Sequence, residues 1–389
     1  MTKQQRWMTR LDSPLISTLI AAIIICLFLF ARLSQSNFDF SSYVEAGDYF
    51  CDPARAPQSL TVIPNSPGFD GQFYYRLSLN PFTSQATEFG ITIDNPPYRH
   101  QRILYPLLTW ILSLGNANFV PVMLVLINYI ALCAMGYIGG SYAQMLKQHA
   151  LWGVFLPLCP SFLFTLSRDL VEILEVSLLS GSLLLIRRGK PVSATLLLSL
   201  AVLTRETALL VAGAALIVYV FQRWKSKDAV TIKWHYFVVP MAVFFFWQAL
   251  LFYKWGMFPL HASGAGAGTL GIPFLGPTGF LWSLATLETP FQRRNFVGLV
   301  FLIVFTFGVL YHLHSTAASK LEIVSWILYA TLAVSLSRAV WVEDWSVFRA
   351  VSQFCALGTL IIIAGKAKDK AFIFGCTCLF WLYLSVELI

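Results

Sequence analysis

The chain has 389 residues, of which 57% are hydrophobic and only 12% are charged, whereas about 25% of the residues of a typical soluble domain are charged. This composition excludes an ordinary soluble protein and, with a mean hydropathy of +0.68, is typical of a polytopic membrane protein. The formal net charge is +8, but the basic residues fall in short loops next to apolar runs, where anionic lipid headgroups lie, so this charge requires no nucleic-acid partner.

Apolar runs along the chain predict an all-α fold of about eleven membrane-spanning helices within one integral membrane domain, residues 1–389. The predicted spans are residues 14–33, 118–146, 150–166, 170–187, 191–204, 207–223, 236–253, 296–313, 321–337, 350–365 and 371–388. The first run is too long for a signal peptide and no small-residue cleavage site follows it, so we expect an uncleaved anchor. For residues 103–114 we expect a half-buried or re-entrant helix.

The distribution of charge predicts the orientation in the membrane. Short loops near residues 3–10, 187–190, 223–233 and 366–370 are rich in Lys and Arg and poor in acidic residues, which places them and the N-terminus in the cytoplasm. On the opposite side, acidic and basic residues nearly balance and many lie at or just inside predicted helix ends. Because such charges need partners or water, we infer a polar cavity that opens to the outer face.

Residues 34–102 form the longest stretch without a predicted span, and we expect this extracytoplasmic loop to carry the functional site. It contains GFDGQFYYRL, residues 68–77, in which Gly68 and Gly71 permit a tight turn that lets the carboxylate of Asp70 project freely. The following residues predict an amphipathic helix lying flat on the membrane, with Phe73 and Leu77 towards the lipid. Asp70 either caps that helix or takes part in the chemistry, and both alternatives remain open.

Basic residues follow in the segment YRHQR, residues 98–102, immediately before the chain re-enters the membrane. A single arginine would suffice as an anchor facing water. Two arginines, Arg99 and Arg102, together with the imidazole of His100 and several nearby carboxylates, predict a clamp for a phosphate group.

Further polar clusters recur at predicted outer helix ends. Asp169 and Glu172 lie at the start of a predicted spanning helix, where the helix dipole favours anions. Glu175 is expected about two turns into that span and therefore needs a polar cavity or a basic partner. Arg205 and Glu206 lie in a tight hairpin, where a local ion pair and a functional role are equally open.

The last cluster runs from Arg338 through Glu343 and Asp344 to Arg349. Arg349 comes at the start of a predicted span, where its guanidinium could reach a lipid phosphate.

Together these features resemble the GT-C superfamily of membrane glycosyltransferases. GFDGQFYYRL is similar to the W-D-G-x-Y-x-x-I-A element of PIG-V-like mannosyltransferases, and RILYPLL, residues 102–108, is similar to their F-P-L-Y-P-L-L. Residues 185–210 resemble the mid-chain helix pair of bacterial members. The likeness covers roughly residues 14–215 and beyond them the topology alone. Phe69 stands where a tryptophan is usual in the eukaryotic relatives, and about 36 residues separate the first span from Asp70, so Asp39 and Asp48 compete with it for the acidic role.

The resemblance implies a hexosyltransferase, with mannose as one option, in a bacterial plasma membrane. It would move a monosaccharide from a polyprenyl-phosphate donor to an extracytoplasmic glycan or lipid acceptor, with inversion, in the assembly of surface glycans or glycolipids. Asp70 would be the general base, and no metal or other cofactor is implied. The residues implied for the donor phosphate are Arg99, His100, Arg102, Arg205, Arg338 and Arg349. The acidic or polar residues implied for the pocket are Asp48, Gln72, Tyr74, Tyr75, Asp169, Glu172, Glu175, Glu206, Glu343 and Asp344.

Two alternatives to the enzyme remain. A multispan transporter or flippase for a lipid-linked sugar would carry charges near the bilayer midplane and broken, repeated helices, whereas the charges here cluster at outer helix ends and no repeat is visible. A non-catalytic scaffold for surface-polymer assembly would have no use for the acidic and arginine clusters.

Overall fold

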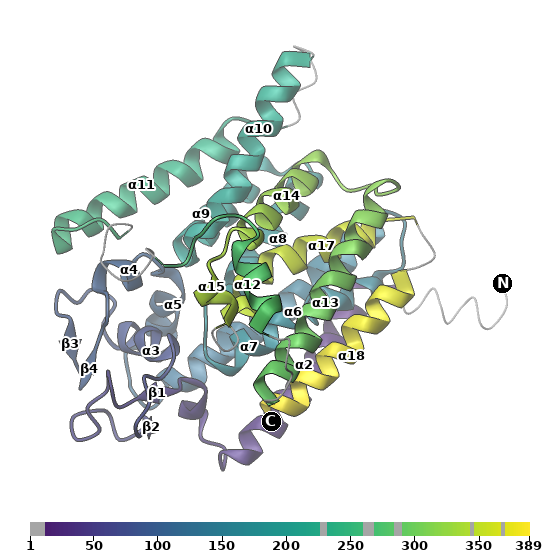
Figure 1. Ribbon diagram of the computed structural model, residues 1–389. Helices are drawn as coiled ribbons and strands as arrows, with labels where there is room; N and C mark the ends of the chain where they lie inside the picture. Colours follow the sequence, from purple (N-terminus) through teal and green to yellow (C-terminus); the bar gives the residue numbers. More distant parts are fainter. Residues whose placement is uncertain (1–11, 226–231, 260–267, 284–289, 343–345, 367–369) are drawn as a thin grey trace.

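The computed structural model describes residues 12–225, 232–259, 268–283, 290–342, 346–366 and 370–389 (Figure 1). The described part is mostly helical. In chain order its elements are α2 (Pro14–Gln35), η1 (Phe40–Tyr43), β1 (Ala46–Gly47), β2 (Val62–Ile63), α3 (Gly71–Leu79), β3 (Thr87–Glu88), β4 (Ile91–Thr92), α4 (Pro96–His100), α5 (Leu104–Ser113), α6 (Val120–Met145), η2 (Ala150–Phe155), α7 (Ser161–Ser167), α8 (Glu172–Arg187), α9 (Pro191–Thr204), η3 (Glu206–Ala208), α10 (Leu209–Lys225), α11 (His235–Trp255), α12 (Leu275–Ser283), α13 (Pro290–Leu313), α14 (Lys320–Val334), α15 (Arg338–Val342), α16 (Ser346–Ala350), α17 (Ser352–Ala364) and α18 (Lys370–Leu388).

Among the described residues, six helical segments are long and apolar enough to cross a membrane, which indicates a multi-pass membrane protein. They are Pro14–Gln35, Val120–Met145, Glu206–Lys225, His235–Trp255, Gln292–Leu313 and Lys370–Leu388. Each lies on a run that the sequence predicts as a span.

The packing of α2 shows how such a helix meets lipid on one side and protein on the other. Leu15, Leu19 and Leu27 are more than half exposed, as expected of a lipid-facing stripe. On the opposite side α2 packs against α6. There the backbone of Gly136 comes so close to α2 that a Cβ on it would lie 3.0 Å from the Cα of Thr18. Small residues thus allow the two backbones to approach.

The other five predicted spans form shorter helices. The run 150–166 folds as two pieces, η2 and α7, so its prediction as one span is wrong. Hydropathy does not reveal this break, because Pro157 and Pro160 interrupt helical hydrogen bonding while the run stays apolar. The remaining four, α8, α9, α14 and α17, have 16, 14, 15 and 13 residues.

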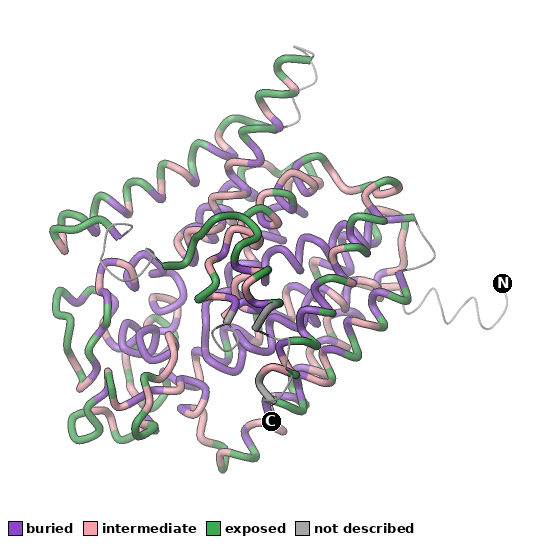
Figure 2. Tube along the Cα trace, in the orientation of Figure 1, coloured by how far each residue is buried: buried purple, intermediate pink, exposed green. Residues whose placement is uncertain are grey.

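The shortest of them, α17, is a core helix. It is about 20 Å long at 1.5 Å per residue, less than the roughly 30 Å of a hydrocarbon core. Every one of its residues is buried, so it packs inside the bundle and has no lipid-facing surface to match to the bilayer (Figure 2). For residues 103–114 the predicted short helix agrees with α5.

Residues 36–102 fold as a compact unit at one end of the bundle, with α3, α4 and the four short strands side by side (Figure 1). β1 pairs in parallel with β2, and β3 pairs antiparallel with β4. All residues of α3 are buried, so the predicted helix flat on the membrane is wrong. Phe73 and Leu77 pack with Ile93 instead. The polar side of the helix is buried in protein as well, where Nη2 of the fully buried Arg76 pairs with Glu88.

The opposite end of the bundle is held by a second buried ion pair. The guanidinium of Arg187 in α8 donates two hydrogen bonds of 2.6 Å to Glu322 in α14, and Tyr142 in α6 donates a third to the same carboxylate. Glu322 also completes a capping box with Ser319. These contacts fix three helices relative to one another at the end that the charge distribution assigns to the cytoplasm.

Candidate active site

The two glycines around Asp70 are required by close backbone packing. Gly68 has a φ of +64°, and a Cβ on it would lie 2.6 Å from the carbonyl oxygen of Glu45. A Cβ on Gly71 would lie 2.5 Å from the carbonyl oxygen of Arg168. Any other residue would therefore push the start of α3 away from the segments that support it. The turn predicted here exists, and it fixes the backbone of Asp70 between the outer loop and the helical bundle.

The carboxylate of Asp70 lies between two guanidinium groups. Its Oδ1 is 2.8 Å from Nη1 of Arg99, and its Oδ2 is 2.5 Å from Nη2 of Arg349. Asp70 occupies the N-cap position of α3, but its side chain makes no capping hydrogen bond within the described residues. The expected free projection is therefore wrong, and the geometry favours an electrostatic role over capping. The side chain remains 19% exposed.

These neighbours decide the charge of Asp70. Burial by itself would raise the pKa of the carboxyl group, but the charges of Arg349, Arg99 and Arg102 outweigh burial and hold the pKa well below its ordinary value. Asp70 is therefore a carboxylate at neutral pH. It is able to accept a proton, but only weakly as long as the guanidinium groups stay in place.

Arg349 joins Asp70 to the helical bundle. Its Nε lies 2.5 Å from Oε1 of Glu172, the first residue of α8. The same oxygen is 2.9 Å from Nη1 of Arg205, which follows α9. Glu172 is fully buried and thus sits between two arginines from different parts of the chain. A short helix near the C-terminal end, α16, in this way contributes directly to a site whose other members lie between residues 70 and 206.

Arg99 is also shared between two carboxylates. Its Nε and Nη2 donate hydrogen bonds of 2.8 and 2.7 Å to the two oxygens of Asp94. Asp94 is not among the residues that the sequence predicts for the site, although its position just before α4 places it within reach of this side chain. Ion pairs connect Asp94, Arg99, Asp70, Arg349, Glu172 and Arg205 in one continuous series. A separate pair, Arg102 with Glu206, lies near enough for the charge of Arg102 to act on Asp70. These eight residues together are called here the outer ion-pair network.

Arg102 and Glu206 form the remaining pair of this network. Arg102 donates hydrogen bonds of 3.1 and 2.7 Å to Glu206 and further ones to the hydroxyl oxygens of Tyr74 and Tyr98. Glu206 pairs with Arg102, and Arg205 pairs with Glu172. The alternative expectation of a local ion pair between Arg205 and Glu206 is therefore wrong. The adjacent charges point to separate partners.

Glu175 lies beside the network without an arginine in its hydrogen bonds. The sequence predicts Glu175 about two turns into its helix. Because α8 begins at Glu172, Glu175 instead belongs to the first turn, and that prediction is wrong. Its carboxylate accepts hydrogen bonds from the hydroxyl of Thr207 at 3.0 Å and from the side-chain amide of Gln353 at 2.5 Å. Gln353 is a partner that the sequence does not reveal, because it comes from α17.

The two other acidic candidates of the loop serve local turns. Asp39 caps η1 through the amide of Ser41 and accepts a hydrogen bond of 2.6 Å from Thr61. Asp48 accepts hydrogen bonds from the amides of Asn65 and Ser66. Of the three competing carboxylates, Asp70 is the one that the structure brings together with arginines of the outer ion-pair network.

His100 lies apart from this network. Its ring is buried against Trp255, with 5.3 Å between ring centroids, and its Nδ1 is 2.9 Å from the carbonyl oxygen of Pro96. Burial lowers the pKa of His100 to about 4. The imidazole is therefore neutral at pH 7 and offers no positive charge to a phosphate.

Other predicted site residues also lie elsewhere. Gln72 accepts a hydrogen bond from the amide of Gly47 and donates one to the carbonyl of Pro67, which fastens the loop. Tyr75 packs in the hydrophobic core. Arg338 is exposed at the start of α15. Glu343 and Asp344 lie outside the described residues.

Asp169 is fully buried, in a left-handed conformation with a φ of 49°. Neither of its carboxylate oxygens has a hydrogen-bond partner in the part of the chain that the structure describes. The preceding residue, Arg168, stacks over the ring of Phe69 at 4.4 Å and pairs with Glu45 at 3.5 Å. The backbone of Arg168 also lies against Gly71, so this segment supports the start of α3.

No family model, curated protein or solved structure matches this chain. Within the described residues no group of three or more His, Cys, Asp or Glu side chains could hold a metal ion, and the carboxylates alternate with guanidinium groups. Such an array can bind an anion through its arginines and can take a proton on a carboxylate.

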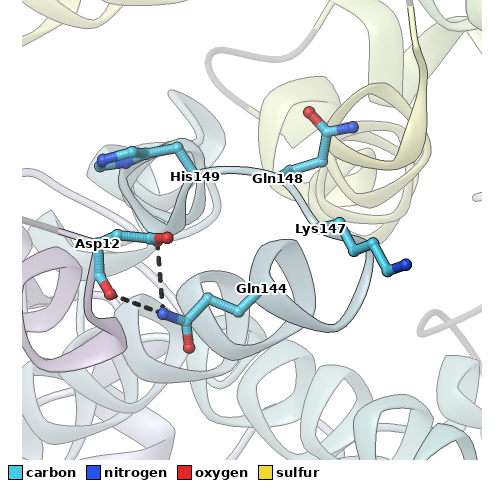
Figure 3. Close-up of a pocket in the computed structure, with 5 residues that line it drawn as sticks. All are labelled: Asp12, Gln144, Lys147, Gln148 and His149. Atoms are coloured by element: carbon cyan, nitrogen blue, oxygen red, sulfur yellow. Dashed lines mark hydrogen bonds between the residues drawn. The ribbon is translucent and has the colours of Figure 1, made fainter. Parts of the chain in front are cut away.

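A polar hollow of about 410 Å³ lies at the other end of α2, lined by Asp12, Gln144, Lys147, Gln148 and His149 (Figure 3). Asp12 there accepts hydrogen bonds from the side chain of Gln144 and from the amide of Ala150. The acid thus joins the start of α2 to the end of α6. The hollow is widely open, and we assign it no part in the chemistry of the outer ion-pair network.

Proposed function

We propose that this protein is a multi-pass, GT-C-type membrane glycosyltransferase with a cytoplasmic N-terminus and an active site on the outer face of a bacterial plasma membrane. It transfers a monosaccharide, such as a hexose, from a polyprenyl-phosphate donor to a hydroxyl group of an extracytoplasmic glycan or lipid. The observation that carries the proposal is the position of Asp70, a partly exposed carboxylate held between Arg99 and Arg349.

The reaction places one demand on a base and another on cations. The acceptor oxygen forms a bond to the anomeric carbon while the bond from that carbon to the phosphate oxygen breaks. The acceptor proton moves to the carboxylate of Asp70. The electron pair of the broken bond leaves on the phosphate, whose growing negative charge is stabilised by guanidinium groups. One site can meet both demands. Asp70 supplies the base, and the charges that act on it come from the guanidinium groups of Arg349, Arg99 and Arg102.

The location of charge supports an enzyme over a transporter. α8 carries Glu172 of the outer ion-pair network at its first residue and Arg187, which pairs with Glu322, at its last. The buried ion pairs of this helix therefore lie at its two ends. A transporter would place substrate-binding charges near the midplane of the bilayer.

The decisive experiment is a transfer assay with the purified full-length protein in lipid nanodiscs. The protein is incubated with a panel of polyprenyl-phosphate sugars and candidate acceptors, and release of polyprenyl phosphate is measured. We expect release from one class of donor, and a loss of about 100-fold or more in the Asp70→Asn variant. Arg55→Gln is the control, because Arg55 lies on the same loop with its side chain 81% exposed.

Two results would overturn the proposal. Full activity of Asp70→Asn would exclude Asp70 as the general base. Absence of polyprenyl phosphate release from every donor would exclude the proposed transfer reaction. Movement of intact lipid-linked sugar across a vesicle membrane, without its cleavage, would establish the flippase instead.

A further inference from the structure

Every arginine of the outer ion-pair network already faces a carboxylate. Arg99 pairs with Asp70 and Asp94, and Arg102 pairs with Glu206. Arg349 and Arg205 complete the network through Glu172. Positive and negative side chains of this network are thus matched, and among the residues that the structure describes the network offers no spare cation for a phosphate. An incoming phosphate gains a guanidinium partner only if a carboxylate gives one up.

Exposure identifies the pair that opens. The side chain of Arg349 is 18% exposed, whereas those of Arg99 and Arg205 are 10% exposed and that of Arg102 is 3% exposed. An anion from solvent or from the membrane surface therefore reaches Arg349 most readily.

The two carboxylate partners of Arg349, Asp70 and Glu172, also differ in exposure. Glu172 is fully buried and also bound by Arg205, whereas Asp70 is 19% exposed. Moving Glu172 would leave an uncompensated charge in the protein interior, which is expensive. Asp70 can turn towards solvent at a smaller cost. Glu172 is consequently the fixed partner of Arg349, and Asp70 is the exchangeable one.

We propose that Arg349 is a shared counter-ion, which holds Asp70 before transfer and the departing phosphate afterwards, while Glu172 positions its guanidinium throughout. This inference rests on the proposed glycosyl transfer. It adds a specific exchange of partners, in which the phosphate takes the place of Oδ2 of Asp70 at Nη2 of Arg349.

The charge balance of the reaction fits this exchange. Before transfer, the sugar phosphodiester carries one negative charge and Asp70 carries another. After transfer, Asp70 is neutral because it holds the acceptor proton, and the released phosphate monoester approaches two negative charges at neutral pH. The total is unchanged, so the same arginines suffice at both stages. As Arg349 moves to the phosphate, it stops favouring the ionised form of Asp70, and the carboxyl group keeps the proton more firmly.

Binding of a product-like ligand tests this exchange without any transfer reaction. The probe is farnesyl phosphate, a prenyl phosphate monoester, titrated calorimetrically into the full-length protein in nanodiscs at pH 7.5. We expect Asp70→Asn to bind it about tenfold more tightly than the unmodified protein, because the competing carboxylate is gone. Arg349→Gln should bind it at least tenfold more weakly. Arg55→Gln is the matched arginine control and should bind like the unmodified protein.

A charge-retaining variant gives a second readout. Arg349→Lys, which keeps the charge but loses the forked geometry, provides a second variant should Arg349→Gln unfold, and it should bind the probe with an intermediate affinity.

Each outcome separates this inference from the proposed function. Equal or weaker binding by Asp70→Asn, equal binding by both Arg349 variants, or absence of binding by the unmodified protein would overturn the exchange, whatever the transfer assay shows. Tighter binding by Asp70→Asn together with no release from any donor would support the exchange of anions at Arg349 and overturn the glycosyltransferase.

Discussion

The guanidinium of Arg349 lies 2.5 Å from the carboxylate of Asp70, although one residue belongs to a short helix near the C-terminal end and the other to the first loop. This contact closes the helical bundle onto the loop unit. It also makes the ionisation of Asp70 depend on a distant part of the chain. The properties of the candidate base are therefore set by tertiary packing and not by the GFDG segment alone.

The first prediction concerns pH. Because the pKa of Asp70 in the folded protein is held below its ordinary value, the base stays ionised well below the unperturbed Asp pKa of about 3.9. We expect kcat/KM to show no acid limb from Asp70 between pH 7 and pH 5. Arg349→Lys keeps the charge and should behave similarly, whereas Arg349→Gln should shift the acid limb upward by about one pH unit or more. Rate profiles of the three proteins measure this.

The same shift predicts how stability depends on pH. A carboxyl group with a depressed pKa stabilises the folded state fully above the unfolded pKa of about 3.9, and this contribution is lost as the pH falls through the lower folded value. Asp70→Asn should flatten this acid loss in thermal unfolding scans below about pH 4. An unchanged acid dependence in the variant would contradict the assigned ionisation of Asp70.

Much of the bundle can be predicted from hydropathy, because a lipid-facing helix must be apolar along its whole length. The run 14–33 is predicted within two residues of α2, and 191–204 coincides with α9. Hydropathy fails for 150–166, where two prolines break an equally apolar run. It also overestimates spans such as α17, since an apolar run buried in protein looks the same as one buried in lipid.

The site is predictable only where its residues are close in sequence. Arg99 and Arg102 are separated by about one helical turn, so their common side can be inferred from YRHQR, and His100 falls on another side. The partners of Arg205 and Glu206 cannot be inferred, because each is chosen by the packing of other elements. Gln353 stays hidden for the same reason, since its contact with Glu175 spans two distant helices.

The second prediction concerns the backbone beneath Asp70. Gly71→Ala would place a Cβ 2.5 Å from the carbonyl oxygen of Arg168 and 2.7 Å from that of Val44. We expect a loss of about 1–3 kcal/mol in stability from this overpacking, together with reduced transfer. Gly213→Ala in α10 is the control, because a Cβ there meets no described atom within 4 Å. Thermal unfolding of both variants in detergent makes the comparison, and equal melting temperatures would exclude the tight contact.

The third prediction assigns a positioning role to Glu172. Glu172→Gln keeps the shape of the side chain but removes the charge that holds Arg349 and Arg205. We expect the KM for the donor to rise about tenfold or more while kcat falls less, because phosphate binding is affected more than proton transfer. Glu387→Gln provides a control, since Glu387 is 40% exposed and 3.9 Å from its partner Arg294. Equal losses in kcat and kcat/KM for Glu172→Gln would instead indicate a role confined to the transition state.

The fourth prediction separates stability from chemistry at the other end of the bundle. Arg187→Gln would leave the carboxylate of Glu322, which is 1% exposed, without its cation. Removing one partner of such a buried pair costs about 3–5 kcal/mol, so the melting temperature should fall clearly. The outer ion-pair network is built from other residues, and the kcat of the folded fraction should therefore remain near that of the unmodified protein. Restoring a matched, uncharged pair with Arg187→Met and Glu322→Gln together should recover part of the lost stability. A large loss of kcat in a variant that stays folded would show that the Arg187–Glu322 ion pair is coupled to the candidate active site.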